Sequence, residues 1–173
     1  MNETIRLATV EDAEAMLDIY RPYVEHTAVS FELDPPDAAE FAKRVAHTLE
    51  RYPWLVLDRD GVVVGYAYAG PLKSRAAYNH SVEVSIYLRE DARGQGLGRR
   101  LYDNLEALLR GLGITNLYAC VTYSDGEHDP YLTRDSVFFH ERVGYMRVGF
   151  FHNCGRKFDR QYSVVWMEKI LGD

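Results

Sequence analysis

The sequence has very little cysteine, and its two cysteines, Cys120 and Cys154, are far apart in a chain of 173 residues. A disulfide-stapled domain carries several cysteines in a short chain, and a structural zinc site needs closely spaced ligands. We therefore expect neither arrangement. Cys120 lies within an apolar segment, which favours a role as a small core residue.

Long apolar runs and an excess of positive charge are also missing. No segment approaches the roughly 20 apolar residues of a membrane-spanning helix, and residues 1–4 do not resemble a signal peptide. The net charge of −6 provides no basic field for nucleic acid. We expect a cytoplasmic protein that binds neither a membrane nor nucleic acid. The length and the hydrophobic content of 47% suit one domain over residues 1–173.

The spacing of hydrophobic residues predicts an alternation of strands and helices. Strands are expected over residues 5–8, 54–57, 62–69, 82–88 and 115–121, and near residues 145–151 and 162–168. Helices are expected after Thr9, over residues 37–51, from Leu97 to the glycines that follow residue 110, and from Ser136. The Asp60-Gly61 pair between two of the strands is typical of a tight hairpin turn.

The most informative segment lies between the strand at 82–88 and the helix that follows it. It reads Arg-Gly-Gln-Gly-Leu-Gly-Arg over residues 93–99. Glycine lets the backbone approach a ligand closely, and the first amides of a helix have no partner within the helix. The helix dipole adds attraction for negative charge at that end. The segment therefore predicts a binding loop for a phosphorylated cofactor or substrate.

Four interpretations of this loop compete. A nucleotide-hydrolysing P-loop needs Lys and then Ser or Thr after its last glycine, whereas two arginines follow Gly98. A dinucleotide-binding loop needs G-x-G-x-x-G and an acid after the next strand, whereas this chain has G-x-G-x-G and no clear acid. A third pattern, Arg/Gln-x-x-Gly-x-Gly/Ala, is matched by Arg93, Gly96 and Gly98. The fourth is a tight strand-to-helix turn whose glycines bind nothing.

The third pattern resembles the acetyl-CoA pyrophosphate loop of the GNAT acetyltransferase superfamily, and the flanking segments agree with it. A leucine-rich helix follows the loop, and residues 136–145 look like the late helix of that superfamily, which ends in glycine and an aromatic residue. The resemblance implies a single GNAT domain with an α/β (α+β) fold. It also implies a mixed, mostly antiparallel central sheet of about six to seven strands, flanked by about four helices.

Three further segments narrow the resemblance. Residues 23–32, 70–78 and 155–158 look like the phosphinothricin and methionine sulfoximine N-acetyltransferase branch. That branch implies transfer of an acetyl group from acetyl-CoA to the amine of a small amino-acid-like acceptor, without a metal. Two alternatives stay open. The same fold could acetylate a different amine, such as an antibiotic, a polyamine or a peptide N-terminus, or the chain could be a catalytically silent CoA-binding module.

The chemistry of this reaction requires a base, because a free α-amino group has a pKa near ~8 and must lose a proton before it attacks the thioester. Glu83 is the first candidate, since it lies on the polar face of the strand beside the glycine loop, where the resemblance also places the base. His140 is the second candidate. It matches a late-helix position that is commonly a Tyr proton donor in the superfamily and a His in this branch. A surface salt bridge and a packed histidine are the alternative roles of these two residues.

The resemblance also implies which residues contact acetyl-CoA. Strand residues pair with the pantetheine amides, loop amides meet the pyrophosphate, and arginines add charge. Thr133 stands where the superfamily often has an Asn that contacts CoA, so that contact is open. The full set is Ile86, Tyr87, Leu88, Arg93, Gly94, Gln95, Gly96, Leu97, Gly98, Arg99 and Thr133.

If the branch holds, the acceptor carries a carboxylate or phosphinate, which arginine binds through its planar fork. The expected acceptor residues are Lys73, Arg75 and Tyr78 before the central strand, with Phe31 and Glu32 from the first long loop. An acidic cluster at Asp125, Glu127, His128 and Asp129 fits no calcium-loop spacing and is expected to be a solvated loop. The aromatic C-terminal part, including Phe150, Phe151, Phe158, Tyr162 and Trp166, is expected to supply core and a homodimer surface.

Overall fold

The computed structural model describes residues 2–126 and 128–172 and contains a seven-stranded sheet in the order β1-β2-β3-β4-β5-β7-β6. All neighbouring strands are antiparallel except β4 and β5, which are parallel. The expected mixed, mostly antiparallel sheet is therefore confirmed. The strands are β1 (Glu3–Leu7), β2 (Trp54–Arg59), β3 (Val62–Pro71), β4 (Ser81–Leu88), β5 (Asn116–Tyr123), β6 (Met146–Lys157) and β7 (Arg160–Ile170).

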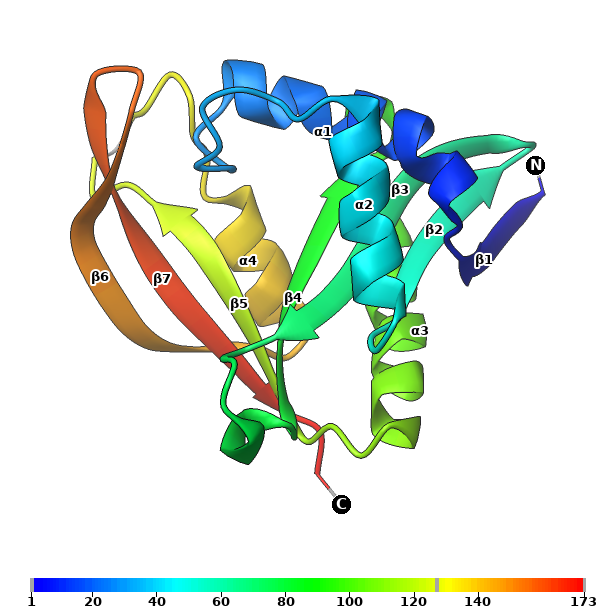
Figure 1. The fold of residues 1–173 in the computed structure, drawn as a ribbon. Coiled ribbons are helices and arrows are strands. Elements are labelled where there is room, and N and C mark those ends of the chain that lie inside the picture. Colours follow the sequence, from blue (N-terminus) through cyan, green and yellow to red (C-terminus); the bar gives the residue numbers. More distant parts are fainter. Residues whose placement is uncertain (1, 127, 173) are drawn as a thin grey trace.

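Four α-helices cover the two faces of the sheet (Figure 1). Helices α1 and α2 pack with β2 and β3 in one apolar cluster, and α3 and α4 contribute to a second cluster on the other face. The described helices are α1 (Ala13–His26), α2 (Ala38–Leu49), α3 (Leu97–Gly111) and α4 (Asp135–Arg142), with short 3-10 turns at residues 10–12, 76–78 and 90–92. No helix in the described residues is both long and apolar enough to cross a membrane.

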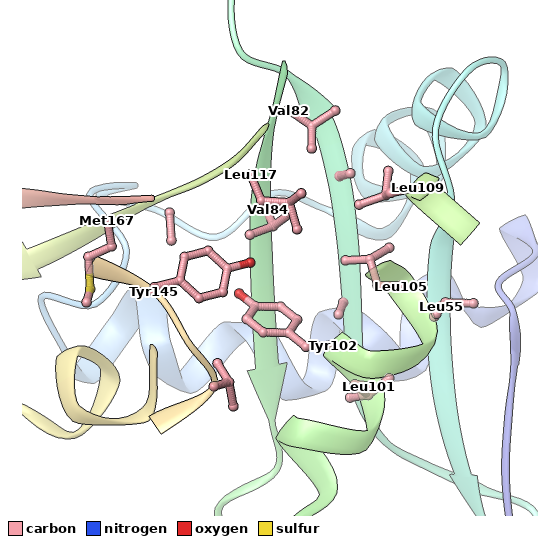
Figure 2. Packing of buried hydrophobic residues seen from close by; sticks show 14 of the residues in the cluster. Leu55, Val82, Val84, Leu101, Tyr102, Leu105, Leu109, Leu117, Tyr145 and Met167 are labelled. Carbon is pink, nitrogen blue, oxygen red and sulfur yellow. The ribbon is translucent and has the colours of Figure 1, made fainter. Parts of the chain in front are cut away.

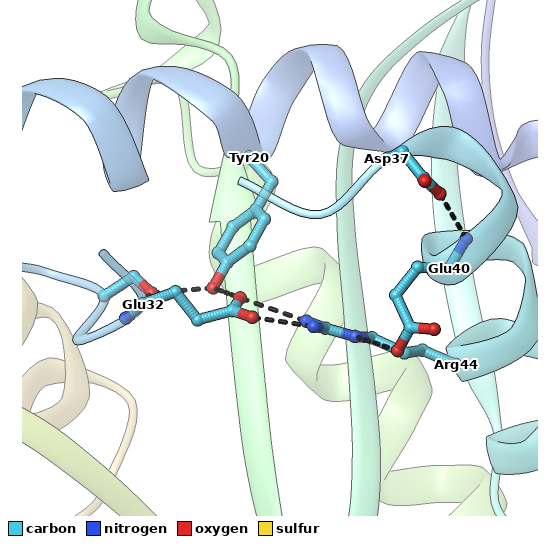
Figure 3. Close-up of polar contacts among 6 residues, drawn as sticks. Tyr20, Glu32, Asp37, Glu40 and Arg44 are labelled. Carbon is cyan, nitrogen blue, oxygen red and sulfur yellow. Dashed lines mark hydrogen bonds and ion pairs between the residues drawn. The ribbon is translucent and has the colours of Figure 1, made fainter. Parts of the chain in front are cut away.

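Local sequence signals account for several of these elements. Asp60 and Gly61 both have positive φ, 52° and 86°, as the predicted two-residue hairpin turn requires. The Asp37 side chain accepts a hydrogen bond from the Glu40 amide at 2.8 Å and so caps the start of α2 (Figure 3). The helix therefore begins one residue later than the sequence predicted and ends at Leu49.

The last two strands are longer than predicted and form one hairpin. Strand β6 extends to Lys157 and β7 begins at Arg160. Between them Phe158 and Asp159 adopt positive φ values of 51° and 57°. A turn with positive φ at both central residues favours glycine and asparagine. Because neither residue stands here, the sequence carries no visible signal for this turn.

The larger apolar cluster lies between α3 and the centre of the sheet (Figure 2). Leu101, Leu105 and Leu109, four residues apart on α3, are all 0% exposed and pack onto the strands. Leu112 follows the last helical residue and is 56% exposed.

The prediction for Cys120 is wrong, because this residue is exposed. Its neighbours Ala119 and Val121 belong to the buried cluster, and alternation along β5 turns Cys120 to the opposite face.

The pairing of β4 with β5 creates the main irregularity of the sheet. In the described structure it runs from Ser81 opposite Asn116 to Glu83 opposite Tyr118. Beyond these residues the two strands diverge, and α4 lies behind the opening (Figure 1). Among the strands that the structure describes, only β3 pairs with β4 as it continues to Leu88. The divergence therefore leaves one edge of β4 free to meet a ligand.

Candidate active site

A cleft with a volume of about 60 Å³ occupies the opening between β4 and β5. Its walls come from residues 84–87 of β4 and 119–122 of β5. Tyr102 of α3 and His140 of α4 also line it, together with Val29 from the loop between α1 and α2. Segments between residues 29 and 140 that are distant in the sequence thus meet where the sheet opens.

The glycine loop lies directly beyond the end of β4. Gly94 and Gly96 have φ values of 72° and 78°, and Gly96 immediately precedes the first residue of α3. These conformations are strained for residues with a side chain, which explains the glycines. Since α3 begins here, its first amides have no carbonyl partner within the helix. The loop therefore presents unpaired donors and the positive end of a helix dipole, as an anion site requires.

Gly98 serves a different purpose from the two glycines before it. A Cβ atom on Gly98 would lie 2.9 Å from the Phe139 ring of α4. This glycine lets α3 and α4 approach each other behind the cleft. The sequence pattern did not distinguish this packing role from ligand contact.

The polar side chains of the loop hold it to neighbouring elements. The Gln95 amide nitrogen donates to the Asp91 carbonyl at 2.8 Å, and its oxygen accepts from Arg59 at 2.7 Å. Arg99 donates to the Arg142 carbonyl at 2.7 Å. The Arg93 guanidinium lies 5.0 Å from the centre of the Tyr23 ring. The loop is thus fixed at both ends, and Leu97 is buried beneath it.

Glu83 lies at the point where β4 and β5 separate, and its side chain is half-buried. Burial raises the pKa of its carboxyl group above the usual range, and the positive charge of Lys73 partly offsets this effect. A carboxylate whose pKa is shifted toward neutrality is a better proton acceptor near pH 7 than an ordinary surface glutamate. Glu83 is not among the residues that line the cleft in the described structure, and its role as a base stays a prediction.

His140 is 4% exposed and makes two hydrogen bonds inside the protein. Its Nδ1 lies 2.7 Å from the Ser136 carbonyl, and its Nε2 lies 2.9 Å from the Tyr102 hydroxyl. A carbonyl only accepts, so Nδ1 carries the proton and Nε2 accepts from Tyr102. Burial lowers the pKa of His140 to about 4. The imidazole is therefore neutral at pH 7.

Tyr102 was missed at the level of the sequence. It is 1% exposed on the apolar face of α3, its hydroxyl is directed to His140, and the residue lines the cleft. Burial raises the pKa of this hydroxyl well above 10, so it is a neutral hydrogen-bond donor. A tyrosine among leucines at helical spacing was the available signal, because a buried tyrosine usually finds a partner for its hydroxyl.

The predicted acceptor residues lie in two groups. Lys73, Arg75 and Tyr78 are exposed in the loop before β4, and Tyr78 is 42% exposed. In the described structure the residues lining the cleft do not include Arg75 or Tyr78. Lys73 is close enough to Glu83 to affect its pKa.

The second group lies in the α1–α2 loop, residues 27–37. The Glu32 carboxylate accepts two hydrogen bonds from Arg44, at 2.7 and 3.0 Å, and a third from the Tyr20 hydroxyl (Figure 3). Phe31 packs over Gly155 of β6. The Glu32 carboxylate is thus occupied by protein groups that anchor the loop.

Thr133 and one member of the acidic cluster have partners within the protein. The Thr133 hydroxyl accepts a hydrogen bond from the Asp135 amide at 3.3 Å, at the start of α4. The expectation of a solvated cluster is wrong for Asp129, whose side chain is 6% exposed and accepts from the Tyr162 hydroxyl at 2.9 Å and the Tyr131 amide at 2.8 Å. Glu127 lies outside the described residues. Among residues 2–126 and 128–172 no three potential ligands gather as a metal site would need.

Comparison with known proteins agrees with this geometry. The family model described as an acetyltransferase (GNAT) domain matches residues 5–166. A phosphinothricin N-acetyltransferase of Streptomyces viridochromogenes is 34% identical over 95% of this chain and 86% of its own length. A protein of the same name from Alcaligenes faecalis is 36% identical over 97% of this chain and 82% of its own length.

A solved structure extends the similarity to three dimensions. The GNAT superfamily phosphinothricin acetyltransferase of Sinorhizobium meliloti, crystallised in complex with AcCoA, has a TM-score of 0.87 and 33% identity to this chain. The match covers 99% of this chain and 90% of that one. This chain thus resembles these proteins in both sequence and fold over nearly its whole length.

Proposed function

The chain belongs to the GNAT acetyltransferase family, and from that membership we propose that it acetylates the amine of a small amino-acid-like acceptor of the phosphinothricin or methionine sulfoximine type. The chain is an acetyltransferase that uses acetyl-CoA. The observation that carries the proposal is the half-buried Glu83 carboxylate, which stands where the sheet opens beside the glycine loop.

We propose that acetyl-CoA lies along the free edge of β4. The pantetheine amides pair with the backbone of residues 86–88, and the pyrophosphate meets the amides of the loop at residues 94–98. The divergence of β4 from β5 and the unpaired start of α3 support this placement. The thioester then reaches the cleft near Glu83.

Glu83 accepts a proton from the acceptor ammonium group, either directly or through a water molecule. The neutral amine attacks the acetyl carbonyl, a carbon–nitrogen bond forms, and the carbon–sulfur bond breaks. The attacking nitrogen then loses its second proton to solvent, and the departing thiolate takes up a proton from solvent. His140 is neutral, so we assign it to hold the Tyr102 hydroxyl at the cleft rather than to act as a charged acid.

We propose that the acceptor carboxylate or phosphinate is bound by Arg75, with Lys73 and Tyr78 from the same loop. All three are exposed and able to turn toward a ligand. Their position in the chain, before the strand that bears Glu83, supports the proposal. It requires the loop to move toward the cleft when the acceptor binds.

We also propose that a second copy of the chain covers the exposed edge strand β6. Its apolar residues Met146, Val148, Phe150 and Phe151 are 63, 49, 40 and 57% exposed. Such a row on an edge strand favours association. Light scattering coupled to gel filtration will test this homodimer.

Acetyl-CoA is an intracellular metabolite, which supports the expected cytoplasmic location.

Release of CoA thiol from acetyl-CoA with a panel of amines tests the function. The panel holds phosphinothricin, methionine sulfoximine, methionine sulfone, polyamines, aminoglycosides and short peptides. We expect turnover on the first three. Glu83→Gln should lower kcat by about 10²- to 10⁴-fold and leave the acetyl-CoA Kd unchanged.

Other outcomes change the proposal in defined ways. Turnover only on another class of amine would keep the acetyltransferase and reject the acceptor assigned here. Acetyl-CoA binding with no turnover on any amine would favour a silent CoA-binding module. Wild-type turnover in Glu83→Gln would remove Glu83 as the base.

A further inference from the structure

Lys157, at the end of β6, carries an ammonium group that is almost completely enclosed. The residue is 4% exposed, and its Nζ donates to the Val24 carbonyl at 2.6 Å and to the Ser30 carbonyl at 2.8 Å. Val24 lies in the last turn of α1, and Ser30 lies in the α1–α2 loop. One side chain from the far end of the sequence thus joins the end of a helix to the loop that follows it.

A buried ammonium group is costly, so its surroundings must stabilise it. The carbonyls at the end of α1 carry the negative end of the helix dipole, which favours a cation there. The Glu32 carboxylate adds electrostatic attraction, and Arg44 and Tyr20 keep that carboxylate in place (Figure 3). Burial nevertheless lowers the pKa of Lys157 below its usual range. The ammonium group is therefore stabilised by its contacts within the protein and not by water.

The same hairpin contacts the loop a second time. A Cβ atom on Gly155 would lie 2.3 Å from the Phe31 ring, so the ring fills the space that a side chain would need. Lys157 and Gly155 lie two residues apart on β6. The hairpin of β6 and β7 thus contacts the α1–α2 loop in two ways, through the charged hydrogen bonds of Lys157 and through the close packing of Phe31 on Gly155.

The part of the loop held in this way forms a wall of the cleft. The Thr122 hydroxyl of β5 donates to the Val29 carbonyl at 3.3 Å, and the Ala28 amide donates to the Tyr131 carbonyl at 3.0 Å. Val29 itself lines the cleft. A shift of the loop would therefore change the shape of the cleft, which the acceptor amine enters under the proposed function.

We propose that Lys157 is a positioning residue for the amine acceptor, which it serves by holding the α1–α2 loop against the cleft. This inference rests on the proposed function. The two hydrogen bonds of Lys157 do not involve the glycine loop, whose nearest link to α1 is the Arg93 guanidinium over the Tyr23 ring. We therefore expect the affinity for acetyl-CoA to change much less than the affinity for the amine.

Lys157→Met tests the proposal, because methionine keeps a long apolar side chain and removes the charge and the donors. Lys43→Met, an exposed lysine on α2, is the matched control. We expect the KM for the amine to rise about tenfold in Lys157→Met, with the acetyl-CoA Kd within about twofold of wild type. Lys157→Gln keeps an N–H donor, so its KM for the amine should lie between those of wild type and Lys157→Met.

Amide hydrogen exchange gives a second readout that needs no turnover. The amides of Ala28, Val29 and Glu32 are hydrogen-bonded in the loop and should exchange faster in Lys157→Met. The amides within α3 should not change. Gly155→Ala keeps the charge and displaces the Phe31 ring, so it should also raise the amine KM and provides a second route if Lys157→Met fails to fold.

Two results would overturn the proposal. A lower melting temperature with unchanged amine KM and unchanged loop exchange would make Lys157 only a stabilising residue. An equal loss of affinity for amine and acetyl-CoA would show a general disturbance. If wild type acetylates no amine in the panel, the proposed function fails, and unchanged loop exchange in Lys157→Met would separately reject the holding of the loop.

Discussion

The two walls of the cleft are built in different ways. The first consists of β4, a 3-10 turn, the glycine loop and the start of α3, which follow one another over residues 81–98. The second combines Val29 from the α1–α2 loop, the diverging part of β5, and His140 of α4. The first wall is a local structure of the chain. The second depends on contacts between segments that are far apart, such as Ser30 and Lys157, which are 127 positions apart in the sequence.

The walls also differ in the charge state of their titratable groups. Burial raises the pKa of Glu83 on the first wall and lowers the pKa of His140 near the second to about 4. Both shifts have the same cause, since a buried site disfavours the charged form of either group. The result is one carboxyl group whose pKa lies above its usual range and one imidazole that stays uncharged at pH 7.

The largest expected effect is a loss of folding stability at low pH, caused by His140 on the second wall. An unfolded histidine has a pKa near ~6.5, so the stability that the neutral His140 contributes is present above that pH and is lost as the pH falls toward about 4. The loss amounts to about 3 kcal/mol. Urea unfolding of wild type and His140→Gln at pH 7, 5.5 and 4 measures it. We expect the free energy of unfolding to fall less between pH 7 and pH 4 in the variant than in wild type. An equal fall in both proteins would contradict a buried neutral imidazole.

The next effect concerns the first wall alone. Gly96→Val places a β-branched side chain at a φ of 78°, which costs about 1–2 kcal/mol and narrows the approach to the amides. We expect the acetyl-CoA Kd, measured by calorimetry, to rise about tenfold while the amine KM changes little. Gly111→Val, at the other end of α3, is the matched control, because a Cβ there meets nothing within 4 Å. An unchanged Kd in Gly96→Val would remove the loop from the cofactor site.

The smallest effect concerns the anchor of the α1–α2 loop. Arg44→Met removes the two hydrogen bonds to Glu32, whose side chain is 32% exposed, while that of Arg44 is 39% exposed. Solvent screens such a pair, so its contribution stays below about 1 kcal/mol. We expect the amine KM to rise about two- to threefold with an unchanged acetyl-CoA Kd. A larger change in the Kd would mean that the two walls are not independent.

Much of the first wall could be predicted from the sequence. The alternation over residues 82–88 and the glycine spacing at 93–99 are short-range patterns, and both lead to the observed strand, loop and helix. The resemblance of these segments to one family then led to the mixed sheet. Gly98 shows where the pattern stops, because its packing against Phe139 requires a partner 41 positions away.

The second wall could not be predicted in the same way. The sequence placed Cys120 in the core because its segment is apolar, whereas the face it occupies depends on which side of β5 the helices cover. It identified His140 by position but not its neutral state, which results from burial beside Tyr102. Glu32 was predicted to meet a substrate, and only the fold brings Arg44 and Tyr20 to its carboxylate.

The sequence by itself determined most of the elements and the glycine loop between β4 and α3, because backbone conformation and side-chain periodicity depend on residues close together in the chain. Its resemblance to one family led to the base candidate. The tertiary structure alone decided the divergence of β4 from β5, the charge states in the cleft and the fastening of the α1–α2 loop by Lys157. These properties depend on burial and on contacts between distant segments, which only the packed chain contains.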